Sequence, residues 1–154
     1  MNRNPTPKEI FDVPDLAFLQ SAQMERQYFE RKEAPTRAQA MKEGTNVDAI
    51  LKKKLGELQD KIKATLASFA TSNKEPNGGL FVLGVDDEGQ IRGLRHLSSS
   101  ELERLLDISR LLENIHFELK RVDCEDAAGA SNFVYLIYAA YAEKTLVCSA
   151  DSQR

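Results

Sequence analysis

The segment that most constrains the fold is Leu80–Val85, which reads LFVLGV and shows no alternation between apolar and polar residues. A strand with one face in water usually alternates, so an unbroken apolar run indicates a strand that is covered on both faces. Asp86–Gly89 reads as a turn, and Gln90–Leu94 as the returning strand of a hairpin. We therefore expect strand 80–85 to lie in the centre of a sheet that is packed against helices.

Two amphipathic helices are predicted to cover this sheet. The longer one begins near Val47 and repeats apolar residues in steps of three and four as far as Phe69. The second is expected at Glu101–Asn114, after a capping box of Ser100 and Glu103. Segments 29–34, 116–122 and 132–142 read as further strands. The predicted fold class is α/β (α+β), with a mixed four- to five-stranded sheet packed against two main helices.

The length of 154 residues suits a single domain, which we place at residues 16–150. Residues 1–15 contain three prolines and several charges, and we expect them to form a flexible arm with little to pack. Residues 151–154 are interpreted as a tail, and we expect that the chain is a domain cut from a longer protein with further domains after Arg154. Cys124 and Cys148 are too few and too far apart for a disulfide framework or a zinc knuckle.

Charge and hydropathy limit the partners that this chain can have. The formal net charge is −3, so a nucleic-acid role requires a local basic face and cannot rest on the total charge. No segment reads as a signal peptide, and the longest apolar run is half of what a membrane-spanning helix needs. We expect a soluble, cytoplasmic protein without a membrane partner.

The stretch from Gly78 to Gly93 suggests a family. Its paired glycine, apolar strand, Gly-Val-Asp-Asp and glycine turn resemble the signature of the Schlafen-type AlbA-like domain. Upstream, Phe-Ala-Thr-Ser at 69–72 resembles a short motif of that family, and the spacing of Glu25, Glu30 and Lys32 resembles another. The resemblance extends over roughly residues 20–148. The chain departs from the family's pattern at Arg26 and Arg31, and in a longer loop at residues 73–77.

The resemblance implies a protein that acts on nucleic acid, either by binding DNA or RNA or by cutting RNA as a metal-dependent endonuclease. In the nuclease interpretation the matching acidic triad is Glu25, Glu30 and Asp86, with Asp87 as the alternative third member. Carboxylate oxygens suit Mg²⁺ or Mn²⁺, which activates a water molecule and neutralises charge on the phosphate. Lys32 would then steady the scissile phosphate. This interpretation predicts that the three carboxylates lie within roughly 8 Å of one another.

Simpler interpretations stand beside these. Asp86 and Asp87 are residues that any tight turn prefers, and Glu25 and Glu30 suit a solvated surface of salt bridges. A third hypothesis is a protein-interaction domain without a nucleic-acid role, and a homodimer is one assembly that we consider. If the domain binds nucleic acid, five side chains are the expected phosphate contacts: Lys32, Arg37, Lys52, Lys53 and Lys63.

Overall fold

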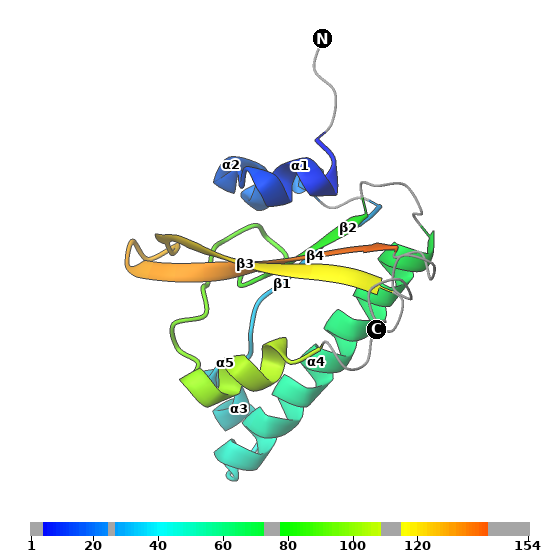
Figure 1. Ribbon diagram of the computed structural model, residues 1–154. Coiled ribbons are helices and arrows are strands. Elements are labelled where there is room, and N and C mark those ends of the chain that lie inside the picture. The colour runs from blue at the N-terminus through cyan, green and yellow to red at the C-terminus, as the bar shows by residue number, and fades with distance from the viewer. Residues whose placement is uncertain (1–4, 25–26, 73–77, 109–114, 142–154) are drawn as a thin grey trace.

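Strand β2 (Gly79–Leu83) lies inside a mixed sheet, as the apolar run predicts (Figure 1). The computed structural model describes residues 5–24, 27–72, 78–108 and 115–141. Within these ranges the sheet has four strands in the order β1-β2-β4-β3. β1 runs parallel to β2, and the two other pairs are antiparallel. The remaining strands are β1 (Phe29–Lys32), β3 (Ile115–Glu125) and β4 (Ser131–Tyr141).

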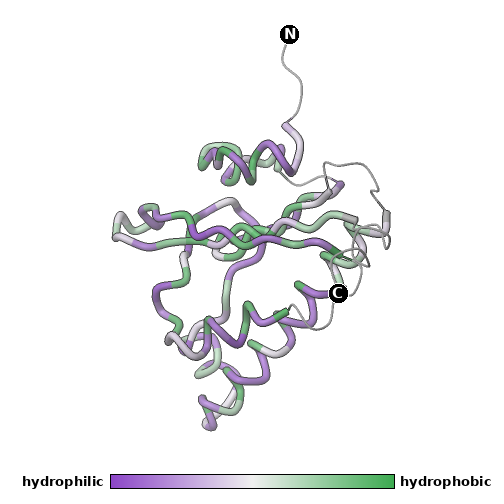
Figure 2. The backbone as a smooth tube through the Cα atoms, in the orientation of Figure 1, coloured by the Kyte–Doolittle hydropathy of each residue, from purple (hydrophilic) through white to green (hydrophobic). Residues whose placement is uncertain are grey.

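Every residue of β2 is buried, and its side chains alternate between two separate clusters. Phe81 and Leu83 pack with the long helix α4 (Val47–Ser72), whose buried stripe contains Ile62 and Leu66. Leu80 and Val82 pack on the opposite face of the sheet. Figure 2 shows the matching pattern in α4, where hydrophilic and hydrophobic positions alternate along the helix. The predicted packing of the long helix over a central strand is therefore confirmed.

The second cluster contains the chain's N-terminal segment, for which the sequence predicts a flexible arm. Pro7–Asp12 forms helix α1, which begins with a capping box of Thr6 and Glu9, and Leu16–Gln20 forms α2. Ile10 and Phe11 are buried against the sheet, so the expectation of a loose arm is wrong for this part. The physical reason is that Leu80 and Val82 make this face of β2 apolar, so it requires a cover, and α1 and α2 lie over it (Figure 1).

Two smaller helices lie on the same face of the sheet as α4 (Figure 1). They are α3 (Arg37–Glu43) and α5 (Ser99–Leu106). The capping box of α5 consists of Ser98 and Glu101, not of Ser100 and Glu103. The two pairs have the same spacing, so the pattern alone did not distinguish them. The predicted continuation of this helix over residues 109–114 lies outside the described residues.

The predicted hairpin after β2 is only partly formed. Val85 and Ile91 form an isolated antiparallel bridge, and the Asp86 N–H donates to the Gln90 carbonyl. Leu94 bonds to β4 and not to β2, because its N–H donates to the Phe133 carbonyl.

Among the described helices, none is long and apolar enough to cross a membrane.

Arg31 of β1 joins the N-terminal layer to the turn after β2. Its side chain is buried, and Nη1 donates to the carbonyls of Leu19 and Ser21 at 2.9 and 2.7 Å. Nη2 donates to the Asp87 carbonyl at 3.3 Å. One guanidinium thus satisfies three backbone acceptors from two segments that are far apart in the sequence. The departure from the family's pattern at this position has a structural role.

We predict that Arg31→Met lowers the free energy of unfolding by about 2–3 kcal/mol, because three backbone carbonyls lose a charged donor in a buried setting. Urea denaturation followed by circular dichroism measures the change. Lys32→Met is the matched control, since Lys32 is the next residue of β1 and is partly exposed. Equal stability of Arg31→Met and the wild type would contradict the structural role of Arg31.

Candidate nucleic-acid interface

Asp86 caps the turn after β2 with both oxygens of its carboxylate. Oδ1 accepts from the N–H groups of Glu88 and Gln90 at 3.0 and 2.9 Å, and Oδ2 accepts from Arg92 Nε at 2.8 Å. The side chain is 2% exposed. Burial raises the pKa of Asp86, but the Gln90 amide and the hydrogen bond and charge of Arg92 outweigh it and lower that pKa below its ordinary value. The geometry matches the turn interpretation of this residue.

The other members of the expected triad have different partners. Glu30 stands opposite Phe81 in the register of β1 and β2, five positions before Asp86. One carboxylate oxygen of Glu30 lies 3.8 Å from Lys61 Nζ of α4, and the other accepts from the Arg31 N–H. Asp87 is exposed and lies 3.8 Å from Lys32 Nζ. Glu25 lies outside the described residues. Within the described ranges, no three His, Cys, Asp or Glu side chains form a group that could hold a metal ion.

The five expected phosphate contacts fall into two sets. Three of them lie beside carboxylates: Arg37 Nη1 is 2.8 Å from Asp48, Lys63 Nζ is 3.7 Å from Asp60, and Lys32 faces Asp87 as described. The remaining two, Lys52 and Lys53, line a groove between α4 and α5. The structure therefore brings two of the five together in one hollow.

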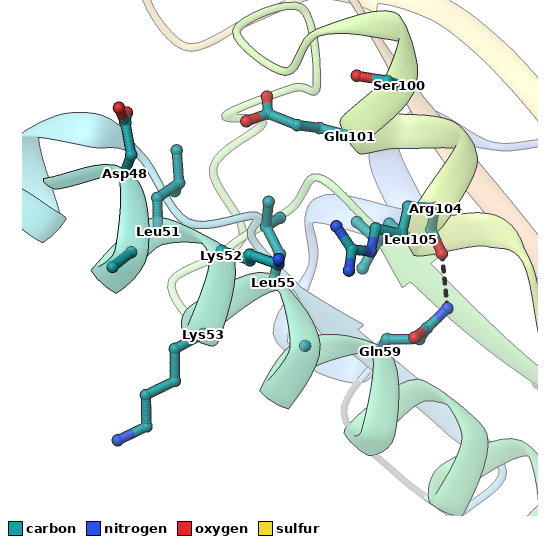
Figure 3. Close-up of a pocket in the computed structure, with 12 residues that line it drawn as sticks. Asp48, Leu51, Lys52, Lys53, Leu55, Gln59, Ser100, Glu101, Arg104 and Leu105 are labelled. Carbon is teal, nitrogen blue, oxygen red and sulfur yellow. Dashed lines mark hydrogen bonds between the residues drawn. The ribbon is translucent and has the colours of Figure 1, made fainter.

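The groove has a volume of about 790 Å³ and lies between two helices that pack against each other. Its apolar lining comes from Leu51 and Leu55 of α4 and Leu105 of α5. Gln59 fixes the spacing of the two helices, because its Nε2 donates to the Arg104 carbonyl at 2.6 Å (Figure 3) and to the Asp107 carbonyl at 3.1 Å. These bonds add a side-chain donor at the end of α5, where the Arg104 carbonyl also accepts from the Asp107 N–H.

The cations of the groove are available, whereas its anions are engaged. Asp48 binds Arg37, and the Glu101 carboxylate accepts from the Ser98 N–H at 2.8 Å within the capping box of α5. Lys52, Lys53 and Arg104 form no ion pair with a carboxylate of the described segments. In Figure 3, Lys52 and Arg104 point toward each other across the groove, while Lys53 points away from α5. Lys52 and Arg104 therefore face each other in a groove whose lining has Glu101 as its one carboxylate without an ion pair among the described residues, and this arrangement favours an anion between the two cations.

Sequence reasoning missed Arg104 and Gln59. Arg104 falls off the apolar stripe of α5, so it was visible as an exposed cation but carried no signal of a neighbour on α4. The packing of α5 against α4 is a tertiary contact between residues about 45 positions apart, which no local pattern encodes. An unexplained polar residue at the edge of the α4 stripe, Gln59, was the available signal.

The glycines of the signature serve packing. Gly79 lies under Phe69, where an added Cβ would meet the ring at 2.3 Å. Gly89 has φ +86°, and a Cβ there would meet the Gln20 carbonyl at 2.1 Å. Only glycine fits at position 89 without strain, because residues with a side chain rarely adopt a positive φ of this size. The motif thus lets the turn after β2 approach the N-terminal layer closely.

The protein thus has a mixed sheet between two helical layers, and a turn capped by Asp86 follows its central strand. The family model described as Schlafen, AlbA_2 matches residues 25–151. Because the match covers most of the chain, the protein belongs to this family. Membership indicates a function related to nucleic acid at a coarse level. No curated protein matches the sequence.

We predict that Asp86→Asn lowers the stability at pH 7 by about 1–3 kcal/mol, because the variant loses charge-assisted bonds to Arg92 and the turn. The folded-state pKa of Asp86 is below its ordinary value of 3.8, so the carboxylate stabilises the fold above that pH. This contribution disappears as the pH falls through the folded-state pKa. The difference between variant and wild type should therefore shrink below about pH 4.

Thermal unfolding followed by circular dichroism from pH 7 to pH 2.5 measures this dependence. Asp87→Asn is the matched control, since the Asp87 side chain is 68% exposed and its ion pair with Lys32 is at 3.8 Å. A deficit of the Asp86 variant that stayed constant down to the lowest pH would contradict the assigned pKa direction.

Proposed function

We propose that the domain binds nucleic acid through the groove between α4 and α5, with Lys52, Lys53 and Arg104 contacting phosphates. The observation that carries the proposal is that Lys52 and Arg104 point toward each other across the groove, with Lys53 beside them on α4, and that none of the three has a carboxylate partner among the described residues. Family membership supports nucleic acid as the class of ligand. The cations of the groove support this surface as the binding region.

Phosphate contacts from lysine and arginine provide most of the sequence-independent affinity of nucleic-acid-binding proteins. A chain with a net charge of −3 needs such contacts gathered locally, and the α4–α5 groove gathers them. Gly56 lines the groove, and an added Cβ there would meet no atom within 4 Å. The sugar-phosphate backbone of a nucleic acid can therefore approach α4 closely at Gly56.

We predict that Lys52→Glu/Lys53→Glu/Arg104→Glu weakens binding at least about tenfold and flattens the salt dependence of the affinity by roughly one unit of slope per lost contact. Fluorescence anisotropy with labelled single-stranded RNA and duplex DNA, at several salt concentrations, measures both quantities. The two probes also distinguish RNA from DNA as the preferred ligand.

The matched control is Lys32→Glu/Lys63→Glu, which reverses two expected contacts outside the groove. Both lysines already lie beside carboxylates, so their reversal should change the affinity much less. Equal losses from both sets would show that charge in general, and not the groove, determines binding. A wild-type protein without measurable affinity for either probe would favour the protein-interaction hypothesis.

The metal-dependent RNA endonuclease is the second proposal. It requires Glu25, Glu30 and Asp86, or Asp87 in its place, on one Mg²⁺ or Mn²⁺ ion, with Lys32 on the phosphate. We rank it second because the turn already engages both Asp86 oxygens. Incubation of the RNA probe with Mn²⁺ or with a chelator separates the two proposals. Cleavage that requires the metal and is abolished by Glu30→Gln would support the nuclease.

A further inference from the structure

The outer side of β3 is a long sheet edge. β3 spans eleven residues and pairs with β4 along its whole length. In the described part of the chain no strand pairs with its other side, because β3 ends the order β1-β2-β4-β3. An edge of this length presents a row of backbone donors and acceptors that can pair with another strand.

The hydrogen bonds around β4 show which residues of β3 point these groups outward. The Asp126 N–H donates to the Ala130 carbonyl, so these two residues form a hydrogen-bonded pair at the hairpin. In an antiparallel ladder such pairs alternate, so the even-numbered residues of β3 bond to β4. The Phe133 carbonyl is consistent with this alternation. Phe133 stands opposite the odd-numbered Asp123, and its carbonyl accepts from the Leu94 N–H on the other side of β4. The odd-numbered residues of β3, Leu119 among them, therefore point their N–H and C=O outward.

The side chains of β3 can pair with those of a second, antiparallel copy of β3. If two copies of β3 pair antiparallel with Leu119 on the two-fold axis, Glu118 of each copy stands opposite Lys120 of the other. Phe117 then stands opposite Arg121. Glu118 and Lys120 form non-hydrogen-bonded pairs, in which opposite side chains approach most closely. Moving the axis by one residue in either direction places two Lys120 or two Glu118 side chains opposite each other, so charge disfavours the two neighbouring registers.

Two further features of β3 fit this arrangement. Leu119 is 40% exposed and is one of only three large apolar side chains that are exposed in the described ranges. Within one copy, Lys120 Nζ donates to the Phe11 and Asp12 carbonyls and Glu118 Oε2 lies 2.9 Å from His116 Nε2, so the ion pairs across the axis are additional to these contacts. Charges on an edge strand normally discourage pairing, but here they disfavour the two registers next to the proposed one.

We propose that the protein forms a two-fold symmetric homodimer through the outer edge of β3, with Leu119 on the axis and one continuous sheet through both copies. Five opposed pairs of outward-pointing residues provide up to about ten backbone hydrogen bonds, two for each pair. Reciprocal Glu118–Lys120 ion pairs favour this register over its two neighbours. The interface uses neither the α4–α5 groove nor the turn at Asp86, so it is independent of nucleic-acid binding.

A disulfide tests the register directly. In the proposed dimer the two Leu119 Cα atoms lie about 5.5 Å apart, within the range that a disulfide bridges. Leu119→Cys, in a background with Cys124→Ser and Cys148→Ser, should therefore form a covalent dimer under mild oxidation on a non-reducing gel. Arg121→Cys in the same background is the control, because the two positions are four residues apart in this register, about 13 Å.

Efficient crosslinking at position 119 with little at position 121 supports the proposal. Equal crosslinking at both positions, or none at position 119 in a folded protein, overturns it.

Charge exchange provides a second, non-covalent test. Glu118→Lys and Lys120→Glu each place like charges across the axis, so each variant should dissociate at concentrations where the wild type sediments as a dimer. An equal mixture of the two variants should restore the dimer, since each copy then faces its complement. Circular dichroism checks that both variants fold. A monomeric wild type, or a mixture that fails to associate although the wild type dimerises, overturns the proposed pairing.

Discussion

The structure depends on keeping both faces of β2 away from water. Leu80 and Val82 on one face and Phe81 and Leu83 on the other are fully buried, so the sheet requires a helical layer on each side. α4 and its neighbours form one layer, and α1 with α2 forms the other (Figure 1). With both faces covered, a ligand or partner meets the domain at the outer surfaces of the helices or at the edges of the sheet. The α4–α5 groove and the outer side of β3 are two such places.

The buried polar side chains of the described core, Arg31 and Asp86, both serve the backbone. Arg31 donates to carbonyls, and Asp86 accepts mainly from amides, so each replaces hydrogen bonds that water would otherwise provide. The two groups also meet at one turn, because Asp87 accepts from Arg31. The Gly-Val-Asp-Asp part of the signature is thereby explained by the turn that it builds. Lys52 and Arg104, which form no ion pair with a carboxylate of the described segments, lie elsewhere, on α4 and α5.

Sequence patterns predicted the elements that periodicity defines. The apolar run at 80–85, the stripe of α4 and the strands near 29, 116 and 132 were all placed correctly, because burial imposes those periods. The helix at Pro7–Asp12 was missed because three prolines dominated the interpretation, although Pro7 occupies the first turn, where proline is tolerated. Of the candidate site, Lys52 and Lys53 were predicted from their helix face. Their neighbour Arg104 was not, since the contact between α4 and α5 is tertiary.

The central claim is that the available charge of the groove, and not the signature turn, meets nucleic acid. Backbone amide NMR during a titration with single-stranded RNA or duplex DNA tests this claim residue by residue. The groove assignment predicts that the largest shifts occur at Lys52, Lys53, Gly56 and Arg104, while the amides of Glu88 and Gln90, held by Asp86, change little. Shifts confined to the turn and β1, with α4 and α5 unchanged, would contradict it.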